Sequence, residues 1–212
     1  MRPRFDLSFY LVLDPALCGD LGMVETARQA ATAGATMIQL RDKQADTARL
    51  VETGRALKQA LAGTDALLVV NDDADAAVAI GADGLHIGQG DLDVALARAR
   101  TGPDMILGVT VETAALAAAL DTAIVDYAGI GPVFATPTKP DHKPPIGFDG
   151  LARMVEACPV PAVAIGGLKA RHANDVFKAG ARGLAVVSAV CGQPDPHAAA
   201  RDIAGAIKRA CR

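Results

Sequence analysis

The sequence predicts an α/β protein, a single-domain (β/α)8 or TIM barrel that spans residues 1–212. Three observations favour this fold. Short apolar runs alternate with longer segments of helical periodicity eight times along the chain. The runs are apolar throughout, as expected for parallel strands that are buried on both faces. Helix ends also pass into strands through a Gly-Ala step in AGATMIQLR, IGADGLHIG and AGARGLAVV, which indicates a weak internal repeat.

An open, doubly wound α/β sheet is the alternative that the same alternation allows. Such sheets often bind dinucleotides through a Gly-x-Gly-x-x-Gly turn. Here Gly129 and Gly131 are followed by Phe134 at the position of the third glycine. The missing fingerprint favours the barrel, in which functional residues are expected on the loops that follow the strands.

The predicted strands are short apolar runs that stop at polar residues or glycine. The first ends before Asp14, the third before Asn71 and the fourth at Gly88. The strands are expected at 9–13, 37–40, 67–70, 84–87, 105–109, 127–130, 162–165 and 183–187.

The predicted helices carry apolar residues at helical spacing. Gly34, Gly81 and Gly180 fit the C-caps of three of them. The helices are expected at 23–33, 46–62, 74–80, 92–99, 113–120, 149–157, 170–179 and 196–210.

Composition excludes several classes of partner. The chain is 51% hydrophobic with only 3% aromatic residues and no Trp, so one large core of Ala, Val, Leu and Ile is expected. A net charge of −3 gives no general attraction to nucleic acid or to anionic membranes. The expected partners are therefore small molecules, and the composition is compatible with a homo-oligomer.

The N-terminal segment and the cysteines favour a soluble, unprocessed, cytoplasmic protein. The first apolar run is too short for a membrane span, and Asp6 and Asp14 interrupt any signal-peptide pattern. The four cysteines lie far apart without a Cys-x-x-Cys motif, which is typical of reduced thiols.

Two acidic residues, Asp72 and Asp91, follow neighbouring predicted strands. Parallel strands bring such residues to one rim, and two carboxylates there suit Mg²⁺, which usually takes one or two protein carboxylates plus substrate phosphates. Helix capping is the alternative reading of both aspartates and of the adjacent Asp73. An EF-hand is excluded, because Ala77 stands where that loop requires Gly and Asp83 where it requires Glu.

Cations and hydroxyls follow other strands. Gln39, Arg41 and Lys43 end the second strand, and two cations on one side of an extended segment can bind an oxyanion cluster, although a solvated charged turn has the same composition. Thr110 ends the fifth strand with a hydroxyl. His86 lies in an apolar strand and is interpreted as a core residue with its hydrogen bonds satisfied.

The long proline-rich loop at 129–147 and the last two strand ends complete the predicted site. Thr136, Thr138 and Lys139 offer two hydroxyls and a cation, and loops of this length inside a barrel are usually functional lids or linkers. Gly167 in the Gly-Gly turn and the segment at 187–188 follow the seventh and eighth strands, where barrels often bind phosphate through exposed backbone amides.

Taken in order, QLRDK (39–43), NDDADAAVAIGADGLHIGQGD (71–91), GPVFATPTKP (131–140), AIGG (164–167) and VVSAV (186–190) resemble the thiamine phosphate synthase family. The resemblance implies a Mg²⁺-dependent enzyme that joins hydroxymethylpyrimidine diphosphate to a thiazole phosphate, releasing pyrophosphate and forming thiamine phosphate. It implies that the carbon–oxygen bond of the pyrimidine diphosphate ionises first and that the thiazole nitrogen then captures the cation.

The resemblance also implies a role for each matching residue. The metal would be held by Asp72 and Asp91. The pyrimidine diphosphate would be held by Gln39, Arg41, Lys43, Asn71, Thr110 and Lys139, of which Arg41, Thr110 and Lys139 are also catalytic. The thiazole phosphate would be held by Thr136, Thr138, Gly167, Val187 and Ser188.

Three positions depart from the family's usual pattern. The family often has Ser where Thr110 stands, His where Glu112 stands and Glu where Asp42 stands. Thr110 keeps a hydroxyl, whereas Glu112 adds negative charge near a diphosphate site. A related thiazole tautomerase and a non-catalytic phosphate-ligand sensor are the competing functions, and the intact Thr-Pro-Thr-Lys segment argues against the first.

The segment 133–147 is expected to act as a lid. Its prolines restrict the open conformations, and Gly131 and Gly147 bracket it as hinges. Closure would bring Lys139 onto the diphosphate and exclude water from the reacting carbon.

Overall fold

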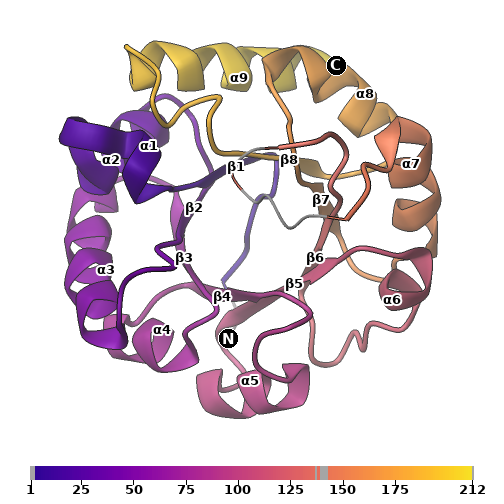
Figure 1. Cartoon of the computed structure of the whole chain (residues 1–212), viewed down its shortest axis with the longest axis horizontal. Helices are drawn as coiled ribbons and strands as arrows, with labels where there is room; N and C mark the ends of the chain where they lie inside the picture. The colour runs from indigo at the N-terminus through magenta and orange to yellow at the C-terminus, as the bar shows by residue number, and fades with distance from the viewer. Residues whose placement is uncertain (1–2, 137, 139–142, 212) are drawn as a thin grey trace.

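A computed structural model describes residues 3–136, 138 and 143–211 of the chain. Eight strands form a closed barrel: β1 (Phe9–Val12), β2 (Met37–Leu40), β3 (Leu67–Asn71), β4 (Gly84–Ile87), β5 (Ile106–Val111), β6 (Tyr127–Ile130), β7 (Ala162–Ala164) and β8 (Gly183–Val186). Each strand pairs in parallel with the next, and β1 pairs with β8 through Tyr10 and Ala185 to close the ring (Figure 1). The predicted barrel is confirmed, and the open doubly wound sheet is wrong.

Helices surround the barrel, and the connections cross from strand to helix around the ring (Figure 1). They are α1 (Pro15–Cys18), α2 (Gly22–Thr32), α3 (Thr47–Leu61), α4 (Ala74–Ile80), α5 (Val94–Thr101), α6 (Ala114–Ala118), α7 (Gly147–Ala157), α8 (Ala173–Lys178) and α9 (Pro196–Ala210), with 3-10 turns η1 (Gly19–Leu21) and η2 (Ala170–His172). No helix within the described ranges is long and apolar enough to cross a membrane.

The sequence did not predict α1 or η1, and it placed the start of α5, the fourth helix that it predicted, two residues early. A four-residue helix offers too few positions for a periodic pattern. The helix predicted from residue 92 begins at Val94 because Asp93 is its N-cap, accepting hydrogen bonds from the backbone N–H groups of Ala95 at 3.0 Å and Leu96 at 3.1 Å.

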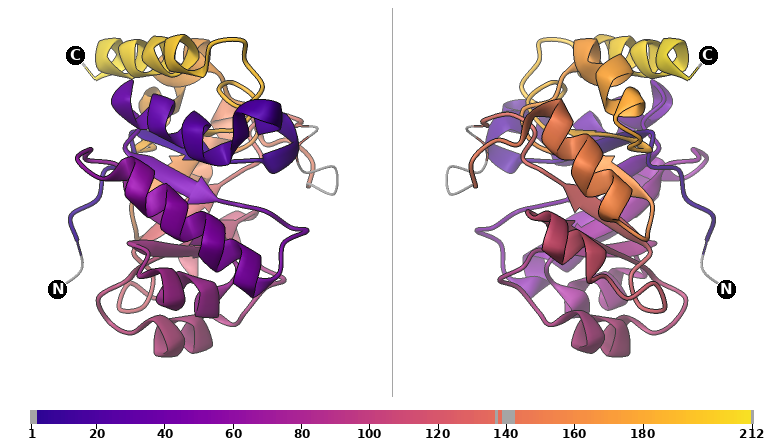
Figure 2. Two further views of the ribbon diagram at one scale, coloured as in Figure 1. Left: turned by 90° about the vertical axis from the view of Figure 1, so that its left-hand side faces the viewer. Right: turned by 90° about the vertical axis from the view of Figure 1, so that its right-hand side faces the viewer.

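Two apolar layers hold the barrel together. The larger layer lies between the strands and the surrounding helices and is built mainly from Ala, Val, Leu and Ile, as the composition predicts. The smaller one fills the barrel interior and includes Leu7, Tyr10, Met37 and Tyr127. The N-terminal segment enters at one end of the barrel, and the long loop after β6 lies at the other (Figure 2). Leu7, 3% exposed, packs in this interior cluster and helps close the first end.

Candidate active site

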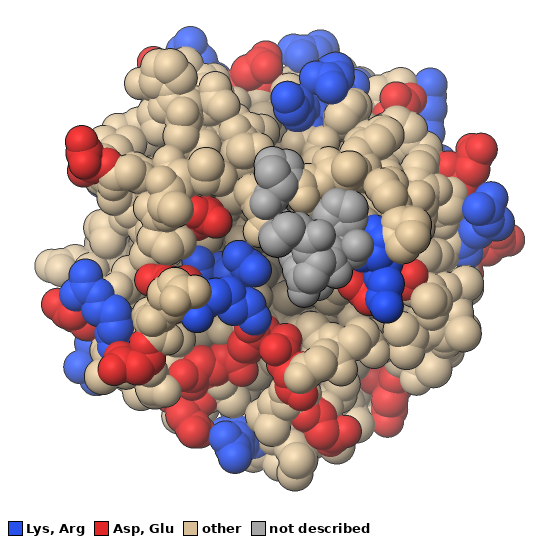
Figure 3. All heavy atoms as spheres, viewed as in Figure 1, with Lys and Arg blue, Asp and Glu red and all other residues tan. Residues whose placement is uncertain are grey.

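A cavity opens at the carboxyl ends of the strands, on the face that Figures 1 and 3 show. Every described residue that the sequence assigns to the site lines it: Gln39, Arg41, Lys43, Asn71, Asp72, Asp91, Thr110, Thr136, Thr138, Gly167, Val187 and Ser188. Lys139 lies outside the described residues. The sequence therefore predicted which residues meet in space, while their individual roles stay predictions.

Asp72 occupies a backbone conformation that few residues adopt. Its φ is 64°, and among the described residues it is the one non-glycine with positive φ. Asp and Asn tolerate this region better than other residues with a Cβ, and such conformations concentrate at functional sites. The Asp72 N–H donates to the carbonyl of His86 at 2.9 Å, so the end of β3 is held against β4. The chain turns sharply at this point, and the Asp72 side chain lines the cavity.

Helix capping explains some of the aspartates near this rim but not the two assigned to the metal. Asp73 caps α4, because its Oδ1 accepts from the N–H of Ala76 at 2.8 Å. Asp91 instead accepts from the N–H of Gly88 at 2.8 Å, which closes the turn after β4. The capping interpretation is thus correct for Asp73 and wrong for Asp72 and Asp91.

The Asp72 and Asp91 carboxylates converge on one cationic group. The ammonium of Lys43 pairs with Asp72 and lies 3.9 Å from the nearer Asp91 oxygen. Burial and, after it, the neighbouring Asp91 carboxyl raise the pKa of Asp72 to about 6, against the opposing effect of Lys43. A divalent cation between the two carboxylates would relieve this repulsion, so the residues present fit Mg²⁺.

The protein offers few metal ligands beyond these two carboxylates. Within the described part of the chain, no group of three or more His, Cys, Asp or Glu side chains is placed to hold a metal ion. Mg²⁺ commonly completes its octahedral shell with water and substrate phosphates. The arrangement therefore suits a metal that binds together with a phosphorylated ligand.

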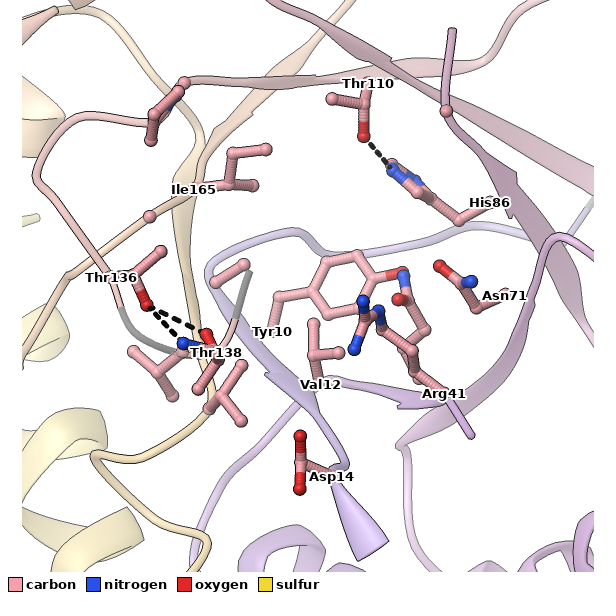
Figure 4. Close-up of a pocket in the computed structure, with 18 of the residues that line it drawn as sticks. Tyr10, Val12, Asp14, Arg41, Asn71, His86, Thr110, Thr136, Thr138 and Ile165 are labelled. Carbon is pink, nitrogen blue, oxygen red and sulfur yellow. Dashed lines mark hydrogen bonds between the residues drawn. The ribbon is translucent and has the colours of Figure 1, made fainter. Parts of the chain in front are cut away.

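Positively charged and neutral donors lie beside the acidic pair. Lys and Arg side chains gather next to Asp and Glu side chains over β2, β3 and β4 (Figure 3). Arg41 and Asn71 point into the cavity from this side, and Thr136 and Thr138 lie on the opposite side (Figure 4). One wall of the cavity can thus bind both an anion and its counter-cation.

The floor of the cavity is a buried polar network. The Nε2 atom of Gln39 donates to the hydroxyl of Tyr10 at 2.8 Å, and the Nε2 atom of His86 lies 2.8 Å from the Thr110 hydroxyl (Figure 4). Burial lowers the pKa of His86 to about 4, so its imidazole is neutral at ordinary pH. The prediction that His86 is a core residue with satisfied hydrogen bonds is confirmed.

Tyr10 was missed by the sequence analysis although it lines the cavity. Its ring projects from β1 into a barrel interior that periodicity treats simply as apolar. The available signal was that the chain contains only two tyrosines, both within predicted strands. Asp14 at the end of β1 also lines the cavity, and it caps α1 by accepting from the N–H of Leu17 at 2.9 Å.

The opposite wall is built from backbone. Gly166 and Gly167 have φ values of 91° and 66°, a region that favours glycine. A Cβ on Gly167 would lie 2.7 Å from the Cβ of Phe134, so the loop after β6 packs directly on this turn. Val187 and Ser188 follow β8 on the same wall. Such exposed backbone is suited to bind a phosphate through its amides.

The base of the long loop is fixed to the barrel. The N–H groups of Val133 and Phe134 donate to the carbonyls of Ile165 at 2.8 Å and Gly166 at 3.1 Å, which extends the pairing of β6 with β7. The rings of Phe134 and Phe148 meet edge to face at 5.2 Å. Farther along, the hydroxyls of Thr136 and Thr138 are 2.8 Å apart. The loop thus places two hydroxyls beside the glycine turn.

Comparison with known proteins gives a consistent result over the whole chain. The family model described as thiamine monophosphate synthase matches residues 9–190. The chain is 45% identical to the thiamine-phosphate synthase of Azorhizobium caulinodans over 212 residues, covering 100% of both chains. It is 47% identical to that of Xanthobacter autotrophicus over 207 residues, covering 98% of each.

Solved structures agree with these matches. The thiamine phosphate pyrophosphorylase of Pyrococcus furiosus superposes with a TM-score of 0.87 at 35% identity, covering 97% of this chain and 98% of that one. A 3-hexulose-6-phosphate synthase superposes with a TM-score of 0.66 at 22% identity, which shows a common barrel fold alone.

Proposed function

This chain belongs to the thiamine-phosphate synthase family, and from that membership we propose how its cavity performs the reaction. The chain is a transferase with thiamine-phosphate synthase activity, as its full-length similarity to such enzymes indicates. The reaction joins hydroxymethylpyrimidine diphosphate to hydroxyethylthiazole phosphate and releases pyrophosphate. The tautomerase and the non-catalytic sensor have no comparable support.

One observation carries the proposed assignment: a single cavity has two walls of different composition, and each is suited to an anion. The wall from β2 to β5 combines cations, hydroxyl and amide donors with the acidic pair, which suits a diphosphate that binds with a metal. The wall from β6 to β8 combines glycine backbone with hydroxyls, which suits a monophosphate. One substrate carries a diphosphate and the other a monophosphate, so each wall suits one of them.

The proposed roles follow from these walls. The diphosphate is bound by Arg41, Lys43, Asn71 and Thr110, with Gln39 on the pyrimidine, and the thiazole phosphate is bound by Thr136, Thr138, Gly167, Val187 and Ser188. The role of Lys139 rests on the family resemblance.

Asp72 and Asp91 are the proposed ligands of Mg²⁺. Bound there, the metal supplies positive charge to the oxygens of the departing pyrophosphate. Lys43 already pairs with Asp72, so it lies where it can move onto a diphosphate oxygen when a metal takes its place.

The chain's own residues favour ionisation of the pyrimidine diphosphate followed by capture. Arg41 and Lys43 stabilise negative charge as it develops on the leaving group, an effect that counts most in a site shielded from water. His86, the one imidazole among the described residues that line the cavity, is not free to activate a nucleophile, because both of its ring nitrogens are hydrogen-bonded. The thiazole nitrogen of the second substrate is therefore the proposed nucleophile, and the protein supplies binding, orientation and exclusion of water.

The cytoplasm is the proposed location. All four cysteines are free thiols, two of them buried, as expected in a reducing compartment.

Incubation of the purified protein with both phosphorylated substrates and Mg²⁺ tests the proposal. Thiamine phosphate and pyrophosphate should appear in equal amounts, and neither substrate should be consumed alone. Isomerisation of a thiazole substrate without condensation would indicate a tautomerase. Binding of both substrates, seen as thermal stabilisation without product, would indicate a sensor and would contradict the proposal.

A further inference from the structure

Five side chains from five strands form one continuous hydrogen-bonded chain beneath the cavity. Gln39 Nε2 lies 2.8 Å from the Tyr10 hydroxyl, which lies 2.8 Å from the Tyr127 hydroxyl. The Tyr127 hydroxyl lies 2.9 Å from His86 Nδ1, and His86 Nε2 lies 2.8 Å from the Thr110 hydroxyl. Gln39 and Thr110, the two ends of this chain, both line the cavity, whereas Tyr127 does not.

The surrounding barrel is shaped to hold the chain. Tyr10 and Tyr127 are 1% and 0% exposed, and no fully buried polar side-chain atom in the described residues lacks a hydrogen-bond partner. A Cβ on Gly108 would overlap the Tyr127 ring, and one on Gly129 would lie 3.2 Å from the His86 ring. Glycines on β5 and β6 thus leave the space that the two rings occupy.

If neither tyrosine hydroxyl donates outside it, such a chain has only two self-consistent directions. Each tyrosine hydroxyl donates one hydrogen, and a neutral imidazole donates from one nitrogen and accepts at the other. If Gln39 donates to Tyr10, then Tyr10 donates to Tyr127 and Tyr127 donates to His86 Nδ1. His86 Nε2 must then carry its hydrogen and donate to Thr110, which leaves the Thr110 hydroxyl hydrogen free for a ligand. In the opposite direction the Thr110 hydroxyl donates its hydrogen to His86 Nε2, so this hydrogen is not available to a ligand.

A bound diphosphate favours one of the two directions. A diphosphate oxygen accepts hydrogen bonds and repels lone pairs, so Thr110 must face it with its hydrogen. His86 is 7% exposed and its two ring nitrogens face neutral hydroxyls, and these surroundings favour the neutral imidazole. At the other end, Gln39 then uses its Nε2 atom on Tyr10 and offers its carbonyl oxygen to the cavity.

We propose that Tyr10, Tyr127 and His86 are positioning residues. They couple the direction in which the Thr110 hydroxyl donates at the diphosphate to the orientation of the Gln39 amide group at the pyrimidine. Gln39 therefore selects a pyrimidine edge that carries an amino group and disfavours an oxo group. This inference rests on the proposed function, since it assumes a diphosphate beside Thr110 and a pyrimidine beside Gln39. Tyr127 does not line the cavity, and Tyr10 acts on the pyrimidine through Gln39.

The tautomer of His86 tests the direction without any turnover. ¹⁵N NMR of histidine-labelled protein, in a variant with His142→Gln, His172→Gln and His197→Gln, reports the two ring nitrogens of His86 alone. With Mg²⁺ and pyrophosphate present, Nδ1 should be unprotonated and Nε2 protonated throughout the neutral pH range. A proton on Nδ1 would overturn the proposed direction, whatever reaction the protein catalyses.

Substrate selectivity tests the coupling. In Tyr127→Phe the Tyr10 hydroxyl loses its acceptor, so it should donate to the Gln39 carbonyl and turn the amide group toward the cavity. The ratio of kcat/KM for the amino pyrimidine diphosphate over its oxo analogue should then fall by about tenfold or more, the effect expected of mismatched hydrogen-bond partners. The KM for the thiazole phosphate should stay within about twofold, since that substrate lies on the other wall.

Thr26→Val is the matched control for a lost buried hydroxyl. Thr26 is 1% exposed and its hydroxyl donates to the carbonyl of Gly22 within α2, away from the cavity. The Thr26→Val variant should leave the selectivity ratio unchanged. If Tyr127→Phe does not fold, Tyr10→Phe applies the same test from the other tyrosine. An unchanged ratio in a folded variant would overturn the proposal, and absence of turnover by the parent protein would instead contradict the proposed function.

Discussion

Asp72→Asn and Asp73→Asn alter two adjacent aspartates in the same way, and we expect opposite effects on the free energy of unfolding. Asp72 lines the cavity beside Asp91, whereas Asp73 caps α4. Asn tolerates the φ of 64° at position 72, so the substitution there removes a charge without straining the backbone. Removing the charge should stabilise the metal-free protein at position 72 and destabilise it at position 73.

The size of the gain at Asp72 follows from its pKa. Burial and the nearby Asp91 carboxyl raise this pKa from 3.8 to about 6 in the folded protein. Folding therefore disfavours the ionised form of Asp72. The resulting loss of free energy of unfolding is absent below pH 3.8 and complete above about pH 6. At about 1.4 kcal/mol per pH unit this destabilisation would be about 3 kcal/mol, and solvent screening of the partly exposed carboxylate lowers it to on the order of 2 kcal/mol. This pKa already includes the opposing effect of Lys43, whose side chain is half-exposed.

The effect at Asp73 has the opposite sign. Its Oδ1 accepts from the N–H of Ala76 at 2.8 Å and its Oδ2 from the hydroxyl of Thr47 at 2.7 Å. Asn still caps a helix but brings no charge to the helix N-terminus, which costs about 0.5 to 1 kcal/mol. Asp73 is also absent from the cavity lining.

Urea unfolding at pH 8 in EDTA, combined with turnover assays in Mg²⁺, measures both effects. Asp72→Asn should be more stable than the parent protein yet lose at least about 100-fold in turnover, because it removes a ligand of the metal. Asp73→Asn should be less stable and nearly fully active. A destabilised or fully active Asp72→Asn variant would refute the assignment of Asp72.

Three further predictions follow from the cavity. Gly167→Ala should raise the KM for the thiazole phosphate by about tenfold while leaving that for the pyrimidine diphosphate unchanged, since position 167 has a φ of 66° and a Cβ there would lie 2.7 Å from Phe134 Cβ. Gly63→Ala is its control, with a φ of 83° but no atom within 4 Å of the added Cβ, so equal KM effects of the two variants would point to backbone strain alone. Lys139→Ala should lower kcat by about 10² to 10³ with little change in KM, the loss typical of one electrostatic donor, whereas Lys143→Ala in the same segment should not. Pyrophosphate should raise the melting temperature only when Mg²⁺ is present, and stabilisation by pyrophosphate in EDTA would show that it binds without the metal.

The barrel could be predicted because each strand is a buried apolar run with a recognisable stop. Eight such runs, separated by segments long enough to cross back over the sheet, leave few other arrangements. Boundaries were harder where two candidate caps stand close together. Asp91 and Asp93 both precede α5, and only the structure shows that Asp93 caps the helix while Asp91 closes the preceding turn.

The rim of the site could be predicted for a related reason, whereas its floor could not. Residues just after parallel strands share one end of the barrel, so strand ends such as Asp72 and Thr110 identify the rim directly. Tyr10 and Tyr127 lie inside the strands, where the sequence pattern does not show which residues point into the barrel and which point outward. The pattern also does not show whether a tyrosine only packs or makes a hydrogen bond. Their link to His86 depends on side-chain directions across non-adjacent strands, which no local pattern contains.

A crystal of the protein with Mn²⁺ and pyrophosphate would test the proposed site most directly, because the anomalous scattering of manganese locates the metal independently of the protein model. We expect one manganese peak about 2 Å from an oxygen of Asp72 and of Asp91, with pyrophosphate oxygens completing the coordination shell. Lys43 should have moved from Asp72 onto the pyrophosphate. A peak elsewhere in the barrel, or pyrophosphate bound on the glycine wall without a metal at Asp72, would contradict it.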